Sequence, residues 1–267
     1  MVNIIVAGAA GRMGIRIINI INETEGVILN GTFEHPDNPM IGQDAGQTAG
    51  IGAKGIKISN SLDDIITTGD VIIDFTIPSA TIENVKKASA AGKAIVIGTT
   101  GISEDEIKEI RRSSEKIPVV LAPNMSIGVN VMFKIAAEMA KLLGNDFDME
   151  IVEAHHRLKK DAPSGTAIGL AKKLAEATGR DLSKTAVYSR HGMIGQRTND
   201  EIGIQTVRAG DITGDHTVLF GGIGERLELT HRAHNRDNFA KGAVMAAKWI
   251  INKKPGLYDM QDVLGLK

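Results

Sequence analysis

The sequence predicts an α/β protein in which a doubly wound parallel sheet is followed by a second, α+β domain with an open mixed sheet. Two observations predict this fold class. Short apolar runs rich in Val and Ile alternate with helical patterns over the first 126 residues, and turn-forming or polar residues follow each run. After residue 200, β-rich segments instead follow one another through glycine-containing turns, which is typical of antiparallel or mixed pairing.

Length and composition limit the possible functions. The 267 residues are enough for two domains, and 42% hydrophobic with 24% charged residues is ordinary for a globular enzyme. The 31 basic and 32 acidic residues nearly cancel, which argues against nucleic-acid or membrane partners. The chain has no cysteine, so disulfides, thiolate metal sites and a cysteine nucleophile are excluded, and no metal site is predicted. Without a basic leader or a long apolar run, we expect a cytoplasmic protein.

A glycine motif follows the first expected strand. Residues 3–7 are β-branched without polar alternation, as in a strand covered on both faces. The next residues have the spacing GxxGxxG and lead into a helical pattern. Gly8 allows a sharp turn, Gly11 lets a pyrophosphate approach the backbone, and Gly14 lets the helix pack close to the strand. This arrangement predicts a Rossmann-like dinucleotide site. The alternative is a glycine-rich turn that binds another phosphate or no ligand.

The end of the second expected strand bears on the choice of cofactor. Residues 27–33 lead into Glu34, which stands where an acidic side chain accepts hydrogen bonds from the adenosine ribose. A carboxylate repels a 2′-phosphate, so Glu34 slightly favours NADH. The neighbouring His35 and Arg12 could still accommodate the phosphate, so NADPH use stays open.

The remaining elements of the first domain repeat the alternation. We expect a loop over 35–55, helices that begin at Ser61, Ser79 and Ser103, and strands over 71–76, 94–97 and 117–121. Ser103 and Glu106 form a capping-box pattern. Ligands of such sheets bind at the carboxyl ends of the strands. The groups expected at this edge are Gly8, Glu34, Thr76, Gly98, Thr99, Thr100 and the turn 122–125.

The second domain is expected over residues 127–235. It should contain a helix over 126–143, an irregular stretch over 179–200, and strands over 147–152, 202–208, 217–221 and 226–230. A final helix over 235–251 and a tail over 255–264 should return to the first domain, which then comprises 1–126 and 236–267. A sheet with no helices for its second face favours burial by another copy of the chain, so we expect a homo-oligomer.

The segment 153–167 is the strongest candidate for a site. Five potentially cationic side chains fall within six residues: His155, His156, Arg157, Lys159 and Lys160. Ser164 then caps a helix over 165–178, whose leading amide groups attract anions. These features predict a pocket that holds a small molecule with more than one carboxylate and delivers a proton to it. The alternative is a solvated basic loop.

The sequence resembles the 4-hydroxy-tetrahydrodipicolinate reductase (dihydrodipicolinate reductase) family over essentially its whole length. The motifs that carry the resemblance are residues 8–14, 74–78, 98–101, 124–130 and, most specifically, 153–167. The resemblance implies transfer of a hydride from NAD(P)H to 4-hydroxy-tetrahydrodipicolinate, a dicarboxylate of the lysine and diaminopimelate pathway, to give tetrahydrodipicolinate. It also implies a homotetramer.

The resemblance also assigns residues. His155 and Lys159 resemble an acid/base pair, His156 a substrate contact, and Gly165 with Thr166 the groups that bind a substrate carboxylate. The implied cofactor contacts are Gly8, Ala9, Ala10, Gly11, Arg12, Met13, Glu34, Gly98, Thr99, Thr100, Ala122, Pro123, Asn124 and Met125. The chain carries His35 where some members carry arginine, which again leaves NADPH use open.

Two other functions are alternatives to this one. An unperturbed histidine titrates near neutral pH, so we expect that either His155 or Lys159 can act as a general acid, in agreement with a reductase. A related dehydrogenase of the aspartate or homoserine type would lack the basic segment. A regulator that senses NADH without chemistry would call for a DNA-binding module or a basic helix, and the sequence contains neither.

Overall fold

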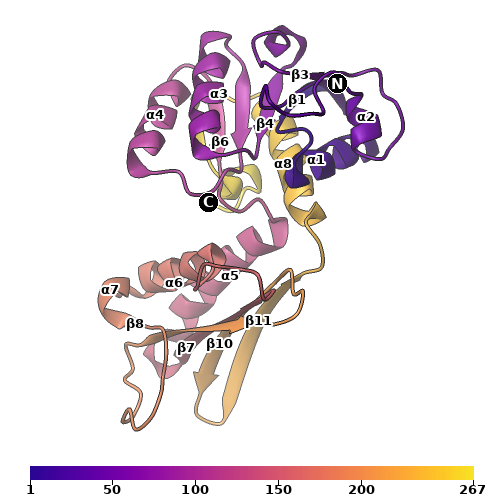
Figure 1. The fold of residues 1–267 in the computed structure, drawn as a ribbon. Coiled ribbons are helices and arrows are strands. Elements are labelled where there is room, and N and C mark those ends of the chain that lie inside the picture. Colours follow the sequence, from indigo (N-terminus) through magenta and orange to yellow (C-terminus); the bar gives the residue numbers. More distant parts are fainter. The chain divides into compact units, whose positions relative to one another are not determined.

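The computed structural model describes all 267 residues, which divide into two compact units. The first comprises Met1–Ile127 and Arg236–Lys267, and the second comprises Gly128–Asn235. Both are built from the elements drawn in Figure 1. None of the helices combines the length and the hydrophobicity that a membrane span requires.

The first unit is organised around a seven-stranded parallel sheet. Its strands are β1 (Val2–Ala7), β2 (Val27–Phe33), β3 (Ile58–Ser59), β4 (Val71–Asp74), β5 (Ala94–Ile97), β6 (Pro118–Leu121) and β12 (Gly256–Tyr258). The order is β12-β6-β5-β4-β1-β2-β3, so β1 lies inside the sheet and the chain winds outward from it in both directions. The doubly wound, Rossmann-like sheet expected from the sequence is confirmed.

Helices cover both faces of this sheet. They are α1 (Arg12–Glu23), α2 (Ala45–Thr48), α3 (Pro78–Ala90), α4 (Glu104–Ser114), α8 (Asp237–Ile250) and α9 (Met260–Val263). Along β1, Ile4 and Val6 join a core with α1 and α8, whereas Ile5 joins a core with α3 and α4. Successive strand residues point to opposite faces, so both faces are apolar and the strand sequence does not alternate.

Three local expectations for this unit need correction. Ser61 does not cap an α-helix: its hydroxyl accepts a hydrogen bond from the amide of Asp63 in a turn, and the only helix there is a 3₁₀ segment, Ile66–Thr68. Helix α3 begins one residue before Ser79, because Pro78 suits the first helical position. The expected loop 35–55 contains the single-turn helix α2, which Asp44 caps. The Ser103–Glu106 capping box is confirmed.

The C-terminal tail completes the first unit. Strand β12 pairs in parallel with β6, and Met260 of α9 joins the core beside α8. The rings of Trp249 and Tyr258 meet edge to face with centroids 5.2 Å apart. The tail therefore covers an edge of the sheet that would otherwise leave backbone groups unpaired.

The second unit contains a five-stranded mixed sheet. Its strands are β7 (Asp148–His155), β8 (Ala186–Val187), β9 (Ile202–Arg208), β10 (Gly214–Gly222) and β11 (Glu225–Ala233), in the order β11-β10-β7-β9-β8. The helices are α5 (Ile127–Leu143), α6 (Gly165–Thr178) and α7 (Leu182–Thr185), with a 3₁₀ turn at Gly144–Asp146. Strand β10 is antiparallel to β7 and β11, whereas β9 is parallel to β7 and β8.

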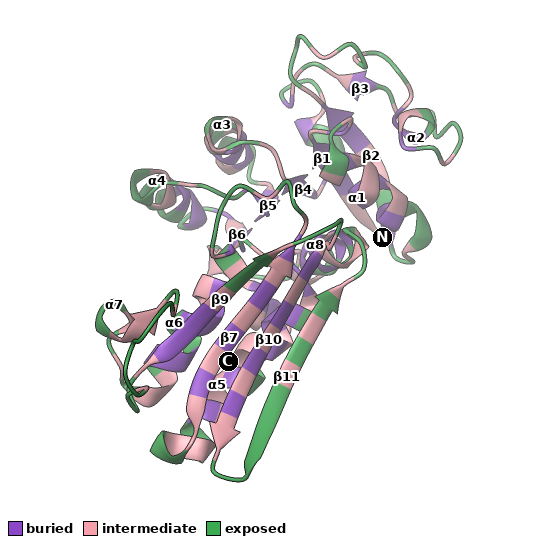
Figure 2. Cartoon of the chain, turned by 60° about the horizontal axis from the view of Figure 1, so that its bottom comes forward, coloured by how far each residue is buried: buried purple, intermediate pink, exposed green.

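Only one face of this sheet is covered. Ile151 and Phe220 point from the sheet into a core with α5 and α6, where Ala136 and Leu170 are also fully buried. Their neighbours along the strands are half-buried, and most of β11 is exposed (Figure 2). The mixed sheet with one open face that the sequence predicts is therefore present.

Strand β7 is longer than expected, so the first residues of the candidate site belong to a strand and not to a loop. The expected strand ended at residue 152, but β7 continues to His155 with strict alternation of burial. Glu153 and His155 occupy core-facing positions, at which a strand pattern is expected to have apolar residues. Strands β10 and β11 are also longer than expected, and α7 with β8 lies within the stretch expected to be irregular.

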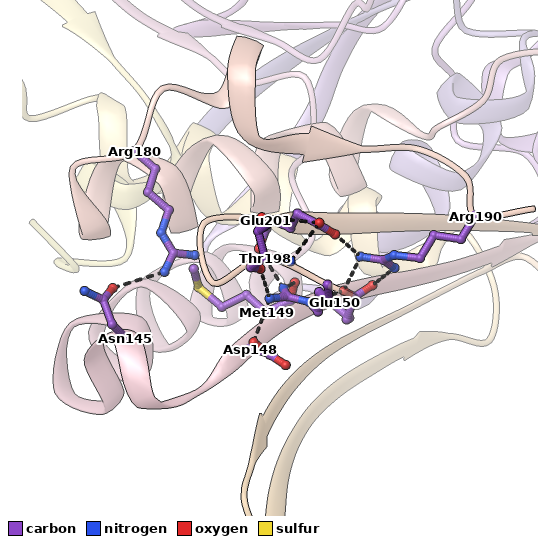
Figure 3. Close-up of polar contacts among 9 residues, drawn as sticks. Asn145, Asp148, Met149, Glu150, Arg180, Arg190, Thr198 and Glu201 are labelled. Carbon is purple, nitrogen blue, oxygen red and sulfur yellow. Dashed lines mark hydrogen bonds and ion pairs between the residues drawn. The ribbon is translucent and has the colours of Figure 1, made fainter. Parts of the chain in front are cut away.

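A group of ion pairs fixes the segment between β8 and β9 (Figure 3). Arg190 forms two hydrogen bonds of 2.8 Å to the carboxylate of Glu150 and a third, of 2.9 Å, to Glu201. Arg197 donates to Asp148 at 2.6 Å, to Glu150 at 3.1 Å and to the carbonyl oxygen of Met149 at 3.2 Å. The segment is thus attached to β7 by charged groups.

Candidate active site

The glycine motif lines a cavity of about 1000 Å³ in the first unit. Gly8 has a φ of +68°, and a Cβ atom on Gly14 would lie 2.0 Å from the carbonyl oxygen of Gly8. Glycine is therefore needed both to turn the chain and to bring α1 close to β1. Other predicted cofactor contacts that line the cavity are Gly11, Arg12, Met13 and Glu34.

Glu34 is held in a defined position at the end of β2. One carboxylate oxygen accepts a hydrogen bond of 2.9 Å from the amide of Ala10, and the other accepts one of 3.1 Å from the amide of His35. The imidazole of His35 lies 3.6 Å from Asp37, and both side chains are exposed. The negative charge of Glu34 therefore faces the cavity in a fixed position.

A buried polar cluster connects the ends of β4 and β5. The carboxylate of Asp74, fully buried, accepts hydrogen bonds from the amide and hydroxyl of Thr76 at 2.8 and 2.6 Å and from Asn84 at 2.8 Å. The hydroxyls of Thr81 and Thr99 are 2.7 Å apart. Sequence reasoning placed Thr76 and Thr99 at this edge but missed the role of Asp74. The role of a buried carboxylate becomes clear only from its hydrogen-bond partners, and these are known only once the fold is known.

The predicted contacts that follow β5 and β6 lie outside that cavity. Gly98, Thr99 and Thr100 follow β5, and Ala122, Pro123, Asn124 and Met125 follow β6. The amide of Ala122 donates to the carbonyl oxygen of Ile97, which keeps the two turns adjacent.

Two further residues pack closely against these turns. A Cβ atom on Gly242 of α8 would lie 1.8 Å from the carbonyl oxygen of Met125, so a glycine is needed where α8 approaches the turn after β6. Sequence reasoning missed Phe75, which lines the cavity and packs against Gly98.

In the second unit, the candidate site begins with a buried carboxylate–imidazole pair at the end of β7. The Nδ1 atom of His155 lies 2.6 Å from a carboxylate oxygen of Glu153, which is fully buried. Arg208 of β9 donates two hydrogen bonds to the same carboxylate, at 2.8 and 2.9 Å, and the amide of Ser164 donates a third at 3.0 Å. The pair therefore joins two strands to the start of α6.

A second histidine packs against the first. His216 of β10 has its Nε2 atom 2.9 Å from the hydroxyl of Ser164, and its ring meets that of His155 edge-on with centroids 5.2 Å apart. The Ser164 hydroxyl also accepts a hydrogen bond from the amide of Ala167, which confirms the predicted cap of α6. Sequence reasoning missed His216, since its approach to Ser164 depends on the register of β10.

The cationic segment between β7 and α6 is anchored by backbone bonds. The carbonyl oxygen of His155 accepts a hydrogen bond from Ala209, and the amide of Arg157 donates to Gly210. The ammonium of Lys159 lies 2.8 Å from the carboxylate of Asp161 and is largely covered, because only 20% of its side chain is exposed. The Nδ1 atom of His156 is buried without a hydrogen-bond partner.

The electrostatics of the pair follow from burial and from its partners. Burial by itself would raise the pKa of Glu153, but the hydrogen bonds from Arg208, His155 and Ser164 outweigh it and lower that pKa. Burial lowers the pKa of His155, and the Glu153 carboxylate opposes this shift only in part. Burial, together with the neighbouring His155, lowers the pKa of His216 to about 3. His216 is therefore neutral near pH 7.

The structure places the predicted substrate groups on one segment. His155 ends β7, His156 and Lys159 follow it, and Gly165 and Thr166 form the first turn of α6. The leading amides of a 14-residue helix carry partial positive charge and lack acceptors within the helix. Together with the ammonium group, this arrangement is suited to bind carboxylates next to a proton donor.

The doubly wound fold with its glycine-lined cavity and the basic segment of the second unit define an oxidoreductase of the nicotinamide-dinucleotide-dependent class. Models of the N-terminus and the C-terminus of dihydrodipicolinate reductase match residues 2–125 and 128–264. The chain belongs to the dihydrodipicolinate reductase family.

Individual relatives agree with this assignment. The chain is 57% identical over 267 residues, all of both chains, to the 4-hydroxy-tetrahydrodipicolinate reductases of Citrifermentans bemidjiense and Geotalea uraniireducens. A solved dipicolinate-bound dihydrodipicolinate reductase from Paenisporosarcina sp. TG-14 is 26% identical, with a TM-score of 0.77 over 98% of each chain. An amine dehydrogenase from Mycobacterium smegmatis, 13% identical with a TM-score of 0.58 over 96% of this chain and 94% of its own, shares the fold.

Proposed function

We propose that this protein is an NAD(P)H-dependent oxidoreductase that converts 4-hydroxy-tetrahydrodipicolinate to tetrahydrodipicolinate in lysine and diaminopimelate biosynthesis. The observation that carries the proposal is the full-length 57% identity to relatives named for this activity. Replacing the hydroxyl group by hydrogen consumes one hydride and one proton and releases water. The protein must therefore hold a hydride donor, a dicarboxylate and a proton source.

The first unit is proposed to hold the dinucleotide, which supplies the hydride. The glycine turn of residues 8–14 and the fixed carboxylate of Glu34 fit a pyrophosphate and a ribose diol, and the cavity has the size of a cofactor site. The proposed contacts are Gly8, Ala9, Ala10, Gly11, Arg12, Met13, Glu34, Gly98, Thr99, Thr100, Ala122, Pro123, Asn124 and Met125. The charge of Glu34 supports a slight preference for NADH over NADPH.

The second unit is proposed to bind the substrate. His155 and Lys159 are the candidate proton donors, His156 contacts the substrate, and Gly165 with Thr166 bind a carboxylate at the start of α6. Burial leaves His155 with a lowered pKa in the free protein. A bound dianion would raise that pKa. The imidazole would then gain a proton when the substrate binds and donate it to the substrate as the substrate ring is reduced.

The second unit is also proposed to mediate oligomerisation, as a homotetramer. The face of its sheet opposite α5 and α6 has no covering helix within the chain, and alternate residues of β7 and β10 are only half-buried there. A cytoplasmic location is proposed from the chain's balanced composition and from its biosynthetic relatives.

The direct test is NADH oxidation by the purified protein. Freshly generated 4-hydroxy-tetrahydrodipicolinate should support oxidation, whereas aspartate semialdehyde alone should not, which separates the reductase from an aspartate- or homoserine-type dehydrogenase. NADH binding without turnover on either compound would contradict the proposal and favour a cofactor-sensing protein.

A further inference from the structure

We propose that Glu153 is a positioning residue for the reaction: its buried carboxylate holds His155 in the tautomer that carries a proton on Nδ1, so that Nε2 alone exchanges a proton with the substrate. The inference rests on the proposed function, because it assumes that His155 is a proton donor. None of the residues predicted from the sequence has this role.

The partners of Glu153 fix the direction of its hydrogen bond to His155. Arg208, bound twice, and the amide of Ser164 can only donate, and they occupy both carboxylate oxygens. Thr206 adds a weaker contact at 3.3 Å. A carboxylate surrounded by donors stays ionised and accepts, so the 2.6 Å contact to His155 requires a proton on Nδ1. The neutral imidazole then has its lone pair on Nε2.

The other side of the imidazole is left available. The Nε2 atom of His155 makes no hydrogen bond within the protein, and 11% of the side chain is exposed. Strand β10 has a glycine at the position beside it: a Cβ atom on Gly214 would lie 3.0 Å from Nε2. The ring edge of His216 fixes the imidazole from β10 as well. The ring therefore presents one nitrogen to Glu153 and the other to a ligand.

The titratable groups around His155 come from four parts of the unit. They are the charged Glu153 on the same strand, Arg208 on β9 and Lys159 with its partner Asp161 in the segment before α6, together with the neutral imidazole of His216 on β10. Arg208 and Lys159 oppose a charged imidazole, and only the adjacent carboxylate of Glu153 stabilises it by direct contact. Loss of that carboxylate would lower the pKa of His155 further.

The test is the variant Glu153→Gln, with turnover measured as a function of pH. We expect kcat to fall at least about 10- to 100-fold, by analogy with loss of the partner that orients a metal-bound histidine. NADH affinity should stay unchanged. The decline of kcat at high pH, which reports loss of the His155 proton, should move to lower pH. Wild-type kcat together with an unshifted pH profile in this variant would overturn the inference.

Glu150→Gln is the matched control. Glu150 lies three positions earlier on β7, accepts two hydrogen bonds from Arg190, and has no histidine partner. It therefore reports the effect of neutralising an arginine-bound carboxylate on this strand. We expect Glu150→Gln to keep the wild-type pH profile. An equal displacement of the profile in both variants would assign the effect to structure and contradict a positioning role.

A measurement on the wild-type protein covers the case in which Glu153→Gln fails to fold. Nitrogen-15 NMR of labelled histidine, with the His155 signals assigned by their absence from His155→Gln, distinguishes the two tautomers. We expect a protonated Nδ1 and an unprotonated Nε2 above the titration of His155, and the reverse result would overturn the inference. Absence of turnover in the wild type would contradict the proposed function, while the tautomer measurement would still decide the role of Glu153.

Discussion

The carboxylate of Glu34 and the backbone amide of Ala10 are joined by a hydrogen bond of 2.9 Å, which holds the acid at the end of β2 against the glycine turn after β1. The charge is thus fixed where the adenosine ribose is proposed to bind. Glu34→Gln keeps the shape and removes the charge. We expect the ratio of the KM for NADPH to that for NADH to fall roughly tenfold, equivalent to about 1.4 kcal/mol.

Asp37→Asn is the control for this prediction, because Asp37 is a nearby acid that is exposed and pairs only with His35. It should leave the KM ratio of the two cofactors unchanged. An equal shift in both variants would show that net charge, and not the position of Glu34, sets the preference.

Gly14→Ala should impair both folding and cofactor binding. The new Cβ atom would lie 2.0 Å from the carbonyl oxygen of Gly8, and backbone atoms cannot move aside as a flexible side chain can. Overpacking of this kind typically costs about 1–3 kcal/mol. We expect a lower Tm and weaker NADH binding. Gly221→Ala, where a Cβ atom meets nothing within 4 Å, should change neither, and a wild-type Tm and Kd for Gly14→Ala would contradict the prediction.

His216 should make stability depend on pH. Its pKa in the folded protein is lowered to about 3 by burial, whereas an unfolded histidine titrates near 6.5. Between these values the unfolded chain binds more protons, so stability is present above about pH 6.5 and is lost as the pH falls. The contribution is about 1.4 kcal/mol per pH unit for one group.

Urea unfolding at pH 7 and at pH 5 measures this dependence. His216→Gln can keep the hydrogen bond to Ser164 and removes the titration, so its free energy of unfolding should fall less between the two pH values. Equal losses in the variant and the wild type would show that His216 does not contribute to the pH dependence.

Arg197→Ala should release the segment between β8 and β9. Arg197 bonds the carboxylates of Asp148 and Glu150 and the carbonyl oxygens of Met149, Thr198 and Glu201, so its loss leaves several partly buried acceptors without a donor. We expect faster thermolysin cleavage near Met193 and Ile194, which are exposed. Arg112→Ala removes a surface ion pair on α4 and should leave the cleavage rate unchanged.

The sequence predicted the first unit well because its signals are local. Apolar runs covered on both faces, glycines at turns and the Ser103 cap each act within a few residues. The elements that the sequence did not predict also have physical explanations. Strand β3 is two residues long, too short for a pattern, and α2 depends on a cap by Asp44 that also binds the distant amides of Lys54 and Gly55.

In the second unit, the sequence predicts the basic segment but not the buried groups that hold it in place. Glu153 and His155 face the core, and polar residues at such positions end an apolar pattern, so the sequence predicts a strand that ends three residues too early. Arg208 meets Glu153 from 55 residues away, through the pairing of β7 with β9. Such a partner becomes visible only when the strand register is known.

The most direct measurement of the central claim is turnover of 4-hydroxy-tetrahydrodipicolinate by His155→Gln and Lys159→Met, next to the wild type. If these two side chains deliver the proton and bind the dicarboxylate, each variant should lose about 100- to 10,000-fold in kcat while its NADH affinity is unchanged. Wild-type turnover in both variants would contradict the account.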